Sequence, residues 1–237
     1  FIIYTGITAD KRKYGFRRAF TFRPQLLKGM LSISGWTMVQ SFLSVSVWFI
    51  FFLAIEHLGE RPLAVTNIVR NIAAMLIMII SAFATTAGAL ISNQIGAGEQ
   101  RFLFKTCRMT LNLAYALLIP LLIVLCLFPE PILRIFTDNP SLITASIPSV
   151  YVMATSTLIS APAFILFNAV SGTGNTRAGF VMEMITLAVY TAAVYYGVIV
   201  LKPDVALCWF SEHIYGIVLI SLTWWYLKSG RWRGKKV

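Results

Sequence analysis

Six long apolar stretches, separated by short polar segments, dominate the pattern of the chain. They cover residues 26–55, 63–93, 105–128, 142–170, 178–200 and 205–228. A helix needs about 20 predominantly apolar residues to cross roughly 30 Å of hydrocarbon, at a rise of about 1.5 Å per residue. Core helices of soluble proteins are rarely this long or this numerous. The pattern therefore predicts an all-α fold, a polytopic bundle of transmembrane helices.

The segments outside the six stretches have their own character. Residues 1–7 (FIIYTGI) are apolar but too short to cross a bilayer, so we interpret them as the end of a preceding transmembrane span. Residues 8–25 form a basic loop, residues 26–228 a six-span lobe, and residues 229–237 a basic tail. The connection 128–140 (FPEPILRIFTDNP) combines paired prolines with apolar periodicity, which predicts a short helix lying in the membrane interface.

Composition and charge placement support a membrane protein. The chain is 58% hydrophobic and 12% charged, against about 45–50% and about 25% in soluble domains. The net charge of +11 does not indicate nucleic-acid binding, because the basic residues sit in short loops and at the ends. If the six stretches alternate in direction, sixteen Lys and Arg residues share one side and four lie on the other. The positive-inside rule then places the first basic loop and the tail in the cytoplasm. We expect the protein in the cell (cytoplasmic) membrane, as a multi-pass protein.

Three short motifs follow one another between the spans. Residues 93–99 read NQIGAGE, residues 136–138 read FTD and residues 171–177 read SGTGNTR. Their order and spacing resemble the second half of the multidrug and toxic compound extrusion (MATE) family. A nucleotide site is not indicated, because GTGNTR carries only part of the G-x-G-x-x-G pattern and follows an apolar helix rather than a strand.

The resemblance implies a twelve-span transporter with two six-span lobes around a central cavity, of which this chain is the second lobe. It further implies export of amphipathic organic cations in exchange for Na⁺ or H⁺, with membrane lipid and an amino-terminal lobe as partners and no cofactor beyond the coupling ion. One departure is clear. Where many members carry an acidic pair, this chain has Gln40 and Ser44 on the first span, and Ser160 and Asn168 on the fourth.

Ionisable side chains inside a span are costly to insert and mark functional sites. Glu183 lies about six residues inside the fifth span, on one helical face with Thr186 and Tyr190. We interpret it as a carboxylate that binds the coupling proton or sodium ion. The alternative is a structural Glu that pairs with a neighbouring helix.

Arg70 and Glu212 lie at similar depths in the second and last spans, so the sequence allows a salt bridge that opens and closes as a gate. Snorkelling of Arg70 to the outer interface is the alternative. Arg70 shares its helical face with Asn67 and Asn71, which we include among the candidates for the cavity lining.

Two stripes of polar and aromatic residues predict a cavity. Such mixed faces suit flat cations, through cation–π contacts and adaptable hydrogen bonds, although ordinary helix packing also uses small polar residues. The candidates on these stripes are Trp36, Gln40 and Ser44 on the first span, and Thr157, Ser160 and Asn168 on the fourth.

Other functions find less support. A flippase for lipid-linked oligosaccharide is the closest alternative, but it should line its cavity with several Arg or Lys residues. An intramembrane enzyme would need convergent His, Asp or Ser groups, and no such catalytic pattern occurs. Three scattered cysteines without metal-ligand spacing (Cys107, Cys126 and Cys208) predict no disulfide and no metal site.

Overall fold

The computed structural model describes residues 24–233, except for the side chains of residues 26, 28–30, 32 and 33. The predicted remnant span (1–7), nearly all of the basic loop (8–25) and the end of the tail (234–237) lie outside the described residues. The chain divides into two compact units, Phe1–Trp36 and Thr37–Val237. The packing described below belongs to the second unit.

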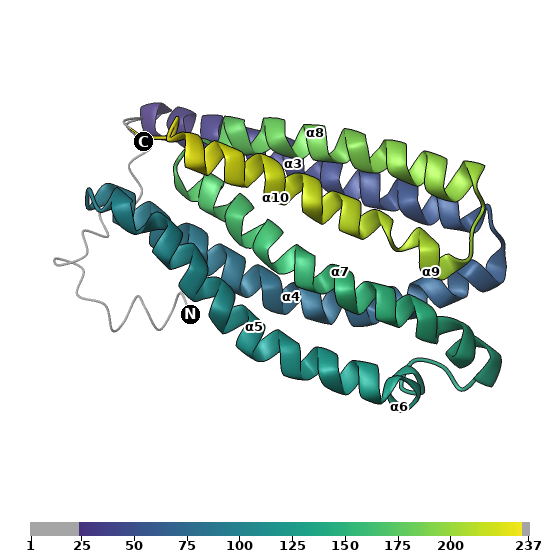
Figure 1. The fold of residues 1–237 in the computed structure, drawn as a ribbon. Helices are drawn as coiled ribbons and strands as arrows, with labels where there is room; N and C mark the ends of the chain where they lie inside the picture. The colour runs from purple at the N-terminus through teal and green to yellow at the C-terminus, as the bar shows by residue number, and fades with distance from the viewer. Residues whose placement is uncertain (1–23, 234–237) are drawn as a thin grey trace, which may run out of the picture. The chain divides into compact units, whose positions relative to one another are not determined.

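Six long helices carry the fold (Figure 1). They are α3 (Pro24–Glu56), α4 (Glu60–Gly96), α5 (Leu103–Leu127), α7 (Pro140–Gly172), α8 (Thr176–Val194) and α10 (Ser211–Ser229). Short elements join or extend them: a 3₁₀ turn (Gln100–Phe102), α6 (Pro129–Leu133), a π-helical segment (Tyr195–Val200) and α9 (Val205–Cys208). The described part of the chain contains no strand, and it has six helical stretches long and apolar enough to cross a membrane. The predicted all-α, six-span fold is therefore confirmed, with boundaries within a few residues of those expected.

Local chemistry explains where the helices begin and end. Asn139 caps α7 by accepting a hydrogen bond from the Ser141 amide, and Pro140 follows at the first helical position. Asn175 caps α8 in the same way, through the Ala178 amide. Gly174 precedes this cap at a φ of +79°, a conformation that side chains disfavour. The SGTGNTR loop is thus a helix stop and start. The short helix expected in 128–140 is present as α6.

The helices alternate in direction along the chain (Figure 1). The connections 97–99 and 173–175 lie at the same end of the bundle as the end of α10. The opposite end holds the connections 57–59, 128–139 and 201–204. Arg101, Lys105, Arg177 and Lys228 lie in the first or last turns of the elements that meet at the first of these ends, as the charge asymmetry of the sequence predicts.

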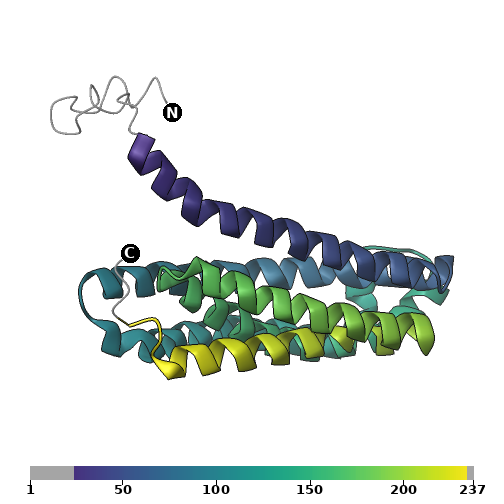
Figure 2. The ribbon, with the colours of Figure 1, turned by 90° about the horizontal axis from the view of Figure 1, so that it is seen from above.

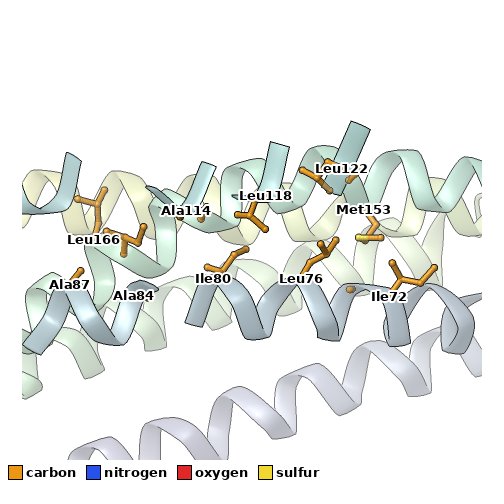
Figure 3. Close-up of a cluster of buried hydrophobic side chains, with 14 of the residues drawn as sticks. Ile72, Leu76, Ile80, Ala84, Ala87, Ala114, Leu118, Leu122, Met153 and Leu166 are labelled. Carbon is orange, nitrogen blue, oxygen red and sulfur yellow. The ribbon is translucent and has the colours of Figure 1, made fainter. Parts of the chain in front are cut away.

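An apolar core joins α4, α5 and α7 (Figure 3). Ile72, Leu76 and Ile80 follow one another at four-residue spacing on α4, so they point the same way. Leu118 of α5 and Met153 of α7 meet this row, and both are almost fully buried. In the turned view, α8 and α10 run side by side as a second layer (Figure 2). The cavity described next lies beside these two helices.

The axes of α4 and α7 come close because two glycines face each other. A Cβ atom placed on Gly172 would lie 2.5 Å from the Gly88 carbonyl oxygen, and one on Gly88 would lie 3.0 Å from the Asn168 carbonyl oxygen. Small residues permit this close backbone approach in membrane helices. The crossing therefore sets the position of Asn168, one turn from Gly172, on the wall of the cavity.

Candidate functional site

A cavity of about 670 Å³ opens among α3, α4, α7, α8 and α10. Its wall is mainly apolar and aromatic, with Trp48, Met78, Phe164, Phe167 and Leu187 among the contributors. The polar side chains on the wall are Gln40, Ser41, Ser44, Ser160, Asn168, Glu183, Tyr190, Glu212 and Tyr215. Ligand sites commonly combine such an apolar wall with a few converging polar groups. No Lys, Arg or His occurs among the described residues that line it.

Glu183 is the most deeply buried charged residue of this cavity, at 3% exposure. Its Oε1 atom accepts hydrogen bonds from the Ser44 hydroxyl at 2.8 Å and from the Tyr215 hydroxyl at 2.9 Å. Its Oε2 atom is buried and has no hydrogen-bond partner. Leaving a buried carboxylate oxygen unpaired is costly, so this oxygen provides a free acceptor for a proton or a cation.

A second carboxylate sits on the facing helix. Glu212 accepts a hydrogen bond from the Tyr190 hydroxyl at 2.8 Å. The two Glu–Tyr pairs are crossed: Glu183 of α8 pairs with Tyr215 of α10, and Tyr190 of α8 pairs with Glu212 of α10. The tyrosine rings touch edge to face, with centroids 5.9 Å apart, and Phe164 lies beside Tyr215 at 6.4 Å. Together they form an aromatic wall between two carboxylates.

A break in the last span positions Glu212. α9 ends at Cys208, and α10 begins at Ser211. Across the break the Phe210, Glu212 and His213 amides each bond to the carbonyl three residues earlier. Such bonds tighten the helix to about three residues per turn, which rotates the residues that follow relative to a regular α-helix. The cavity therefore receives Glu212 and Tyr215 from one short stretch after the break.

Half of the residues predicted to line a cavity do so. Gln40, Ser44, Ser160 and Asn168 all lie on its wall. The remaining four are placed as follows. Thr157 is buried in α7, where its hydroxyl donates a hydrogen bond to the Met153 carbonyl. Asn67 and Asn71 of α4 are not on the cavity wall. Trp36 is the last residue of the first compact unit.

The ion pair between Arg70 and Glu212 that the sequence allows is not formed in this conformation. The Arg70 guanidinium lies over the Phe52 ring, 5.1 Å from its centroid, while Glu212 is bonded to Tyr190. The sequence places both at similar depth, but depth does not determine which side of a helix a residue occupies. In this conformation Arg70 interacts with α3 and is not on the cavity wall.

Tyr215 lies on the cavity wall although it is not among the residues that the sequence predicts there. Its signal was present, because Tyr215 follows Glu212 by three residues and so shares its helical face. Of the titratable residues expected at the site, Glu183, Tyr190 and Glu212 all lie on the cavity wall. Within the described residues no group of His, Cys, Asp and Glu is arranged to hold a metal ion.

Comparisons with solved structures give the same fold. The Vibrio cholerae MATE transporter VcmN in its bent form superposes with a TM-score of 0.79, at 17% identity, over 88% of this chain and 48% of that chain. An outward-facing multidrug resistance MATE family transporter of the MOP superfamily gives 0.76 at 13% identity, over 89% and 47%. A MOP superfamily transporter from Pyrococcus furiosus, described as having a binding pocket of reverse polarity that suggests a different function, gives 0.74 at 12% identity, over 84% and 44%.

The chain thus spans about half the length of these relatives. No curated protein matches it. A family model described as MatE matches residues 37–196, which is more than half of the chain and includes most of the cavity wall. This chain therefore belongs to the MatE family of membrane transporters.

Proposed function

We propose that the chain is the carboxy-terminal lobe of a secondary antiporter of the cell membrane, which exports amphipathic organic cations in exchange for Na⁺ or H⁺. The observation that carries the proposal is the unpaired Oε2 atom of Glu183, buried on the wall of an otherwise apolar and aromatic cavity. In the whole transporter, an amino-terminal lobe completes the cavity and lipid surrounds both lobes.

The composition of the cavity favours organic cations. Aromatic faces attract cations that have lost part of their hydration, and an apolar wall buries the hydrocarbon part of the substrate. The wall offers Trp48, Phe164, Tyr190 and Tyr215 for such contacts. Because none of the described residues on the wall is basic, the two carboxylates are the charged groups that these residues bring to the cavity.

Exchange follows because the Glu183 carboxylate balances only one positive charge at a time. A buried carboxylate in an apolar cavity requires a proton or a cation as its counter-charge. The Ser44 and Tyr215 hydroxyls already occupy Oε1, so proton, sodium ion and substrate compete for Oε2. A carboxylate that binds either the coupling ion or the substrate links the inward movement of one to the outward movement of the other.

A flippase for lipid-linked oligosaccharide is the second candidate. It would hold a pyrophosphate with Arg or Lys side chains. The absence of basic residues from the described wall, and the position of Arg70 over Phe52, favour the antiporter. The Pyrococcus furiosus relative is described as having a binding pocket of reverse polarity, so the charge of the cavity, and not the fold, has to decide between the two candidates.

The test is gradient-driven transport by the full-length protein in vesicles. Movement of a fluorescent organic cation is followed under an imposed Na⁺ or H⁺ gradient, for wild type, Glu183→Gln and Glu60→Gln. Glu60 is an exposed carboxylate at the start of α4, so its variant controls for the loss of one negative charge. We expect coupled movement in wild type and Glu60→Gln and its loss in Glu183→Gln. Absence of movement under either gradient in wild type would refute the antiporter.

A further inference from the structure

The cavity holds two carboxylates, and exchange by Glu183 uses one of them. Glu212 lies on the same wall, contributed by a different helix. Tyr190 donates one hydrogen bond to it, and no Lys, Arg or His among the described lining residues balances its charge. Two carboxylates in an apolar space require two positive charges when the site is loaded. This inference rests on the proposed antiporter and concerns the charge of its substrate.

The crossed pairs place the carboxylates at two levels of the cavity. α8 and α10 run antiparallel and side by side (Figures 1 and 2). One level holds Glu183 with Tyr215, and the other holds Tyr190 with Glu212. The levels are seven residues apart along α8 and three apart along α10, or between about 4.5 and about 10 Å at the α-helical rise. Over most of this range the spacing exceeds the roughly 5.6 Å that one ammonium group with two hydrogen bonds of about 2.8 Å can span, so two cationic groups fit the two carboxylates better than one.

Aromatic side chains fill the wall between the two levels. The Tyr190 and Tyr215 rings touch edge to face, and Phe164 extends this surface from α7. A flat, apolar linker lying on these rings would carry one cationic group toward the Glu183 carboxylate and another toward Glu212. Charge, spacing and wall chemistry therefore describe the same shape of ligand.

We propose that the cavity selects a dicationic amphipathic substrate, with two amidinium or ammonium groups on a flat aromatic linker, and exchanges it for two monovalent ions. In the ion-loaded state each carboxylate holds one proton or one Na⁺. In the substrate-loaded state each holds one end of the dication. Two charges enter for two that leave, so the net charge of the cavity is the same in both states.

The test compares a dication with its monocationic partner. Binding of a fluorescent bis-amidine and of the mono-amidine with the same ring system is measured on the full-length transporter in detergent, for wild type, Glu212→Gln and Glu212→Asp. Gln keeps an acceptor for Tyr190 but removes the charge, whereas Asp keeps the charge. A charge-assisted hydrogen bond in a desolvated site is strong, so we expect the dication to bind wild type about tenfold to a hundredfold more tightly than the monocation. Glu212→Gln abolishes this preference, and Glu212→Asp retains most of it.

Equal binding of the two ligands by wild type would overturn the proposal, as would an equal loss of both in Glu212→Gln. If Glu212→Gln fails to fold, wild type still decides. Bis-amidines with charges about 4.5 to 10 Å apart should then bind more tightly than longer ones, and a flat dependence on length refutes the idea. Transport in vesicles distinguishes a failure of the dication proposal from a failure of the antiporter. If the monocation and the dication move equally well under a gradient, the dication proposal fails while the antiporter stands. If neither moves, the antiporter fails, and the comparison of dication and monocation binding still tests whether the cavity prefers a dication.

Discussion

Substitution of Gly172 by Ala should weaken the packing of α4 against α7. The new Cβ atom would lie 2.5 Å from the Gly88 carbonyl oxygen and 3.2 Å from two further backbone atoms of Gly88. Ordinary contact begins at about 3.4 Å, so the helices must separate by about 0.9 Å or distort locally. Backbone atoms cannot avoid the clash by changing rotamer.

The size of the effect follows from two opposing contributions. Overpacking of a tight interface destabilises by about 1–3 kcal/mol, and this clash with backbone belongs at the upper end. Replacing Gly by Ala inside a helix stabilises by about 0.5–1 kcal/mol. We therefore expect Gly172→Ala to lose about 2 kcal/mol. Gly88→Ala should lose less, because its Cβ would meet the Asn168 carbonyl oxygen at 3.0 Å.

The assay is thermal unfolding of the purified protein in detergent, with Gly96→Ala as the control. Gly96 ends α4 and has nothing within 4 Å of its Cβ position, so Ala there should leave the midpoint unchanged or raise it. The expected order of midpoints is Gly96→Ala highest, then Gly88→Ala, then Gly172→Ala. If Gly172→Ala unfolds at the same temperature as Gly96→Ala, the close crossing of α4 and α7 is wrong.

Two further substitutions test the end of α10 and the role of Arg70. Trp232→Ala should cost about 3–5 kcal/mol in unfolding free energy, because the indole is 2% exposed and donates to a backbone carbonyl of α10 at 2.9 Å. Trp225→Ala, at a site 60% exposed, should change it by less than about 0.5 kcal/mol, and equal losses in denaturation curves would contradict the burial of Trp232. Arg70→Gln should leave cation export within about twofold of wild type, because only a contact with Phe52, about 0.5–1 kcal/mol, is lost. Loss of export, as expected for Glu183→Gln, would instead support the gate formed by Arg70 and Glu212.

Part of the site was predictable because it follows helical periodicity. Gln40 and Ser44 are four residues apart, as are helical neighbours on one face, and both line the cavity. Glu183 and Tyr190 lie seven residues apart on α8 and therefore share one helical face, and both are buried. The spacing of Tyr215 from Glu212 places both on one face of α10, but the contact of Tyr215 with Glu183 crosses a helix interface, and no spacing along one helix encodes such a contact.

The partner of Glu212 is a second feature that the sequence pattern does not show. The pattern predicts one regular helix through residues 205–228, but the i→i−3 hydrogen bonds near Trp209 tighten the chain there. The resulting rotation changes which face Glu212 occupies. Its partner is then Tyr190, on the adjacent α8, and not Arg70 on α4.

The sequence by itself determined the number of spans, their alternation and their ends. Bilayer thickness constrains the chain along one dimension only. The length of each apolar stretch, the charge of the loops and the capping residues are therefore sufficient to predict where each span begins and ends and which way it runs. Only the tertiary structure decided which helical faces meet. Met38 and Phe42 are as apolar as the core yet 69% and 71% exposed, so hydropathy alone does not distinguish an exposed face of a membrane helix from a packed one. The cavity and its crossed Glu–Tyr pairs depend on those contacts between helices, and no pattern along the chain records them.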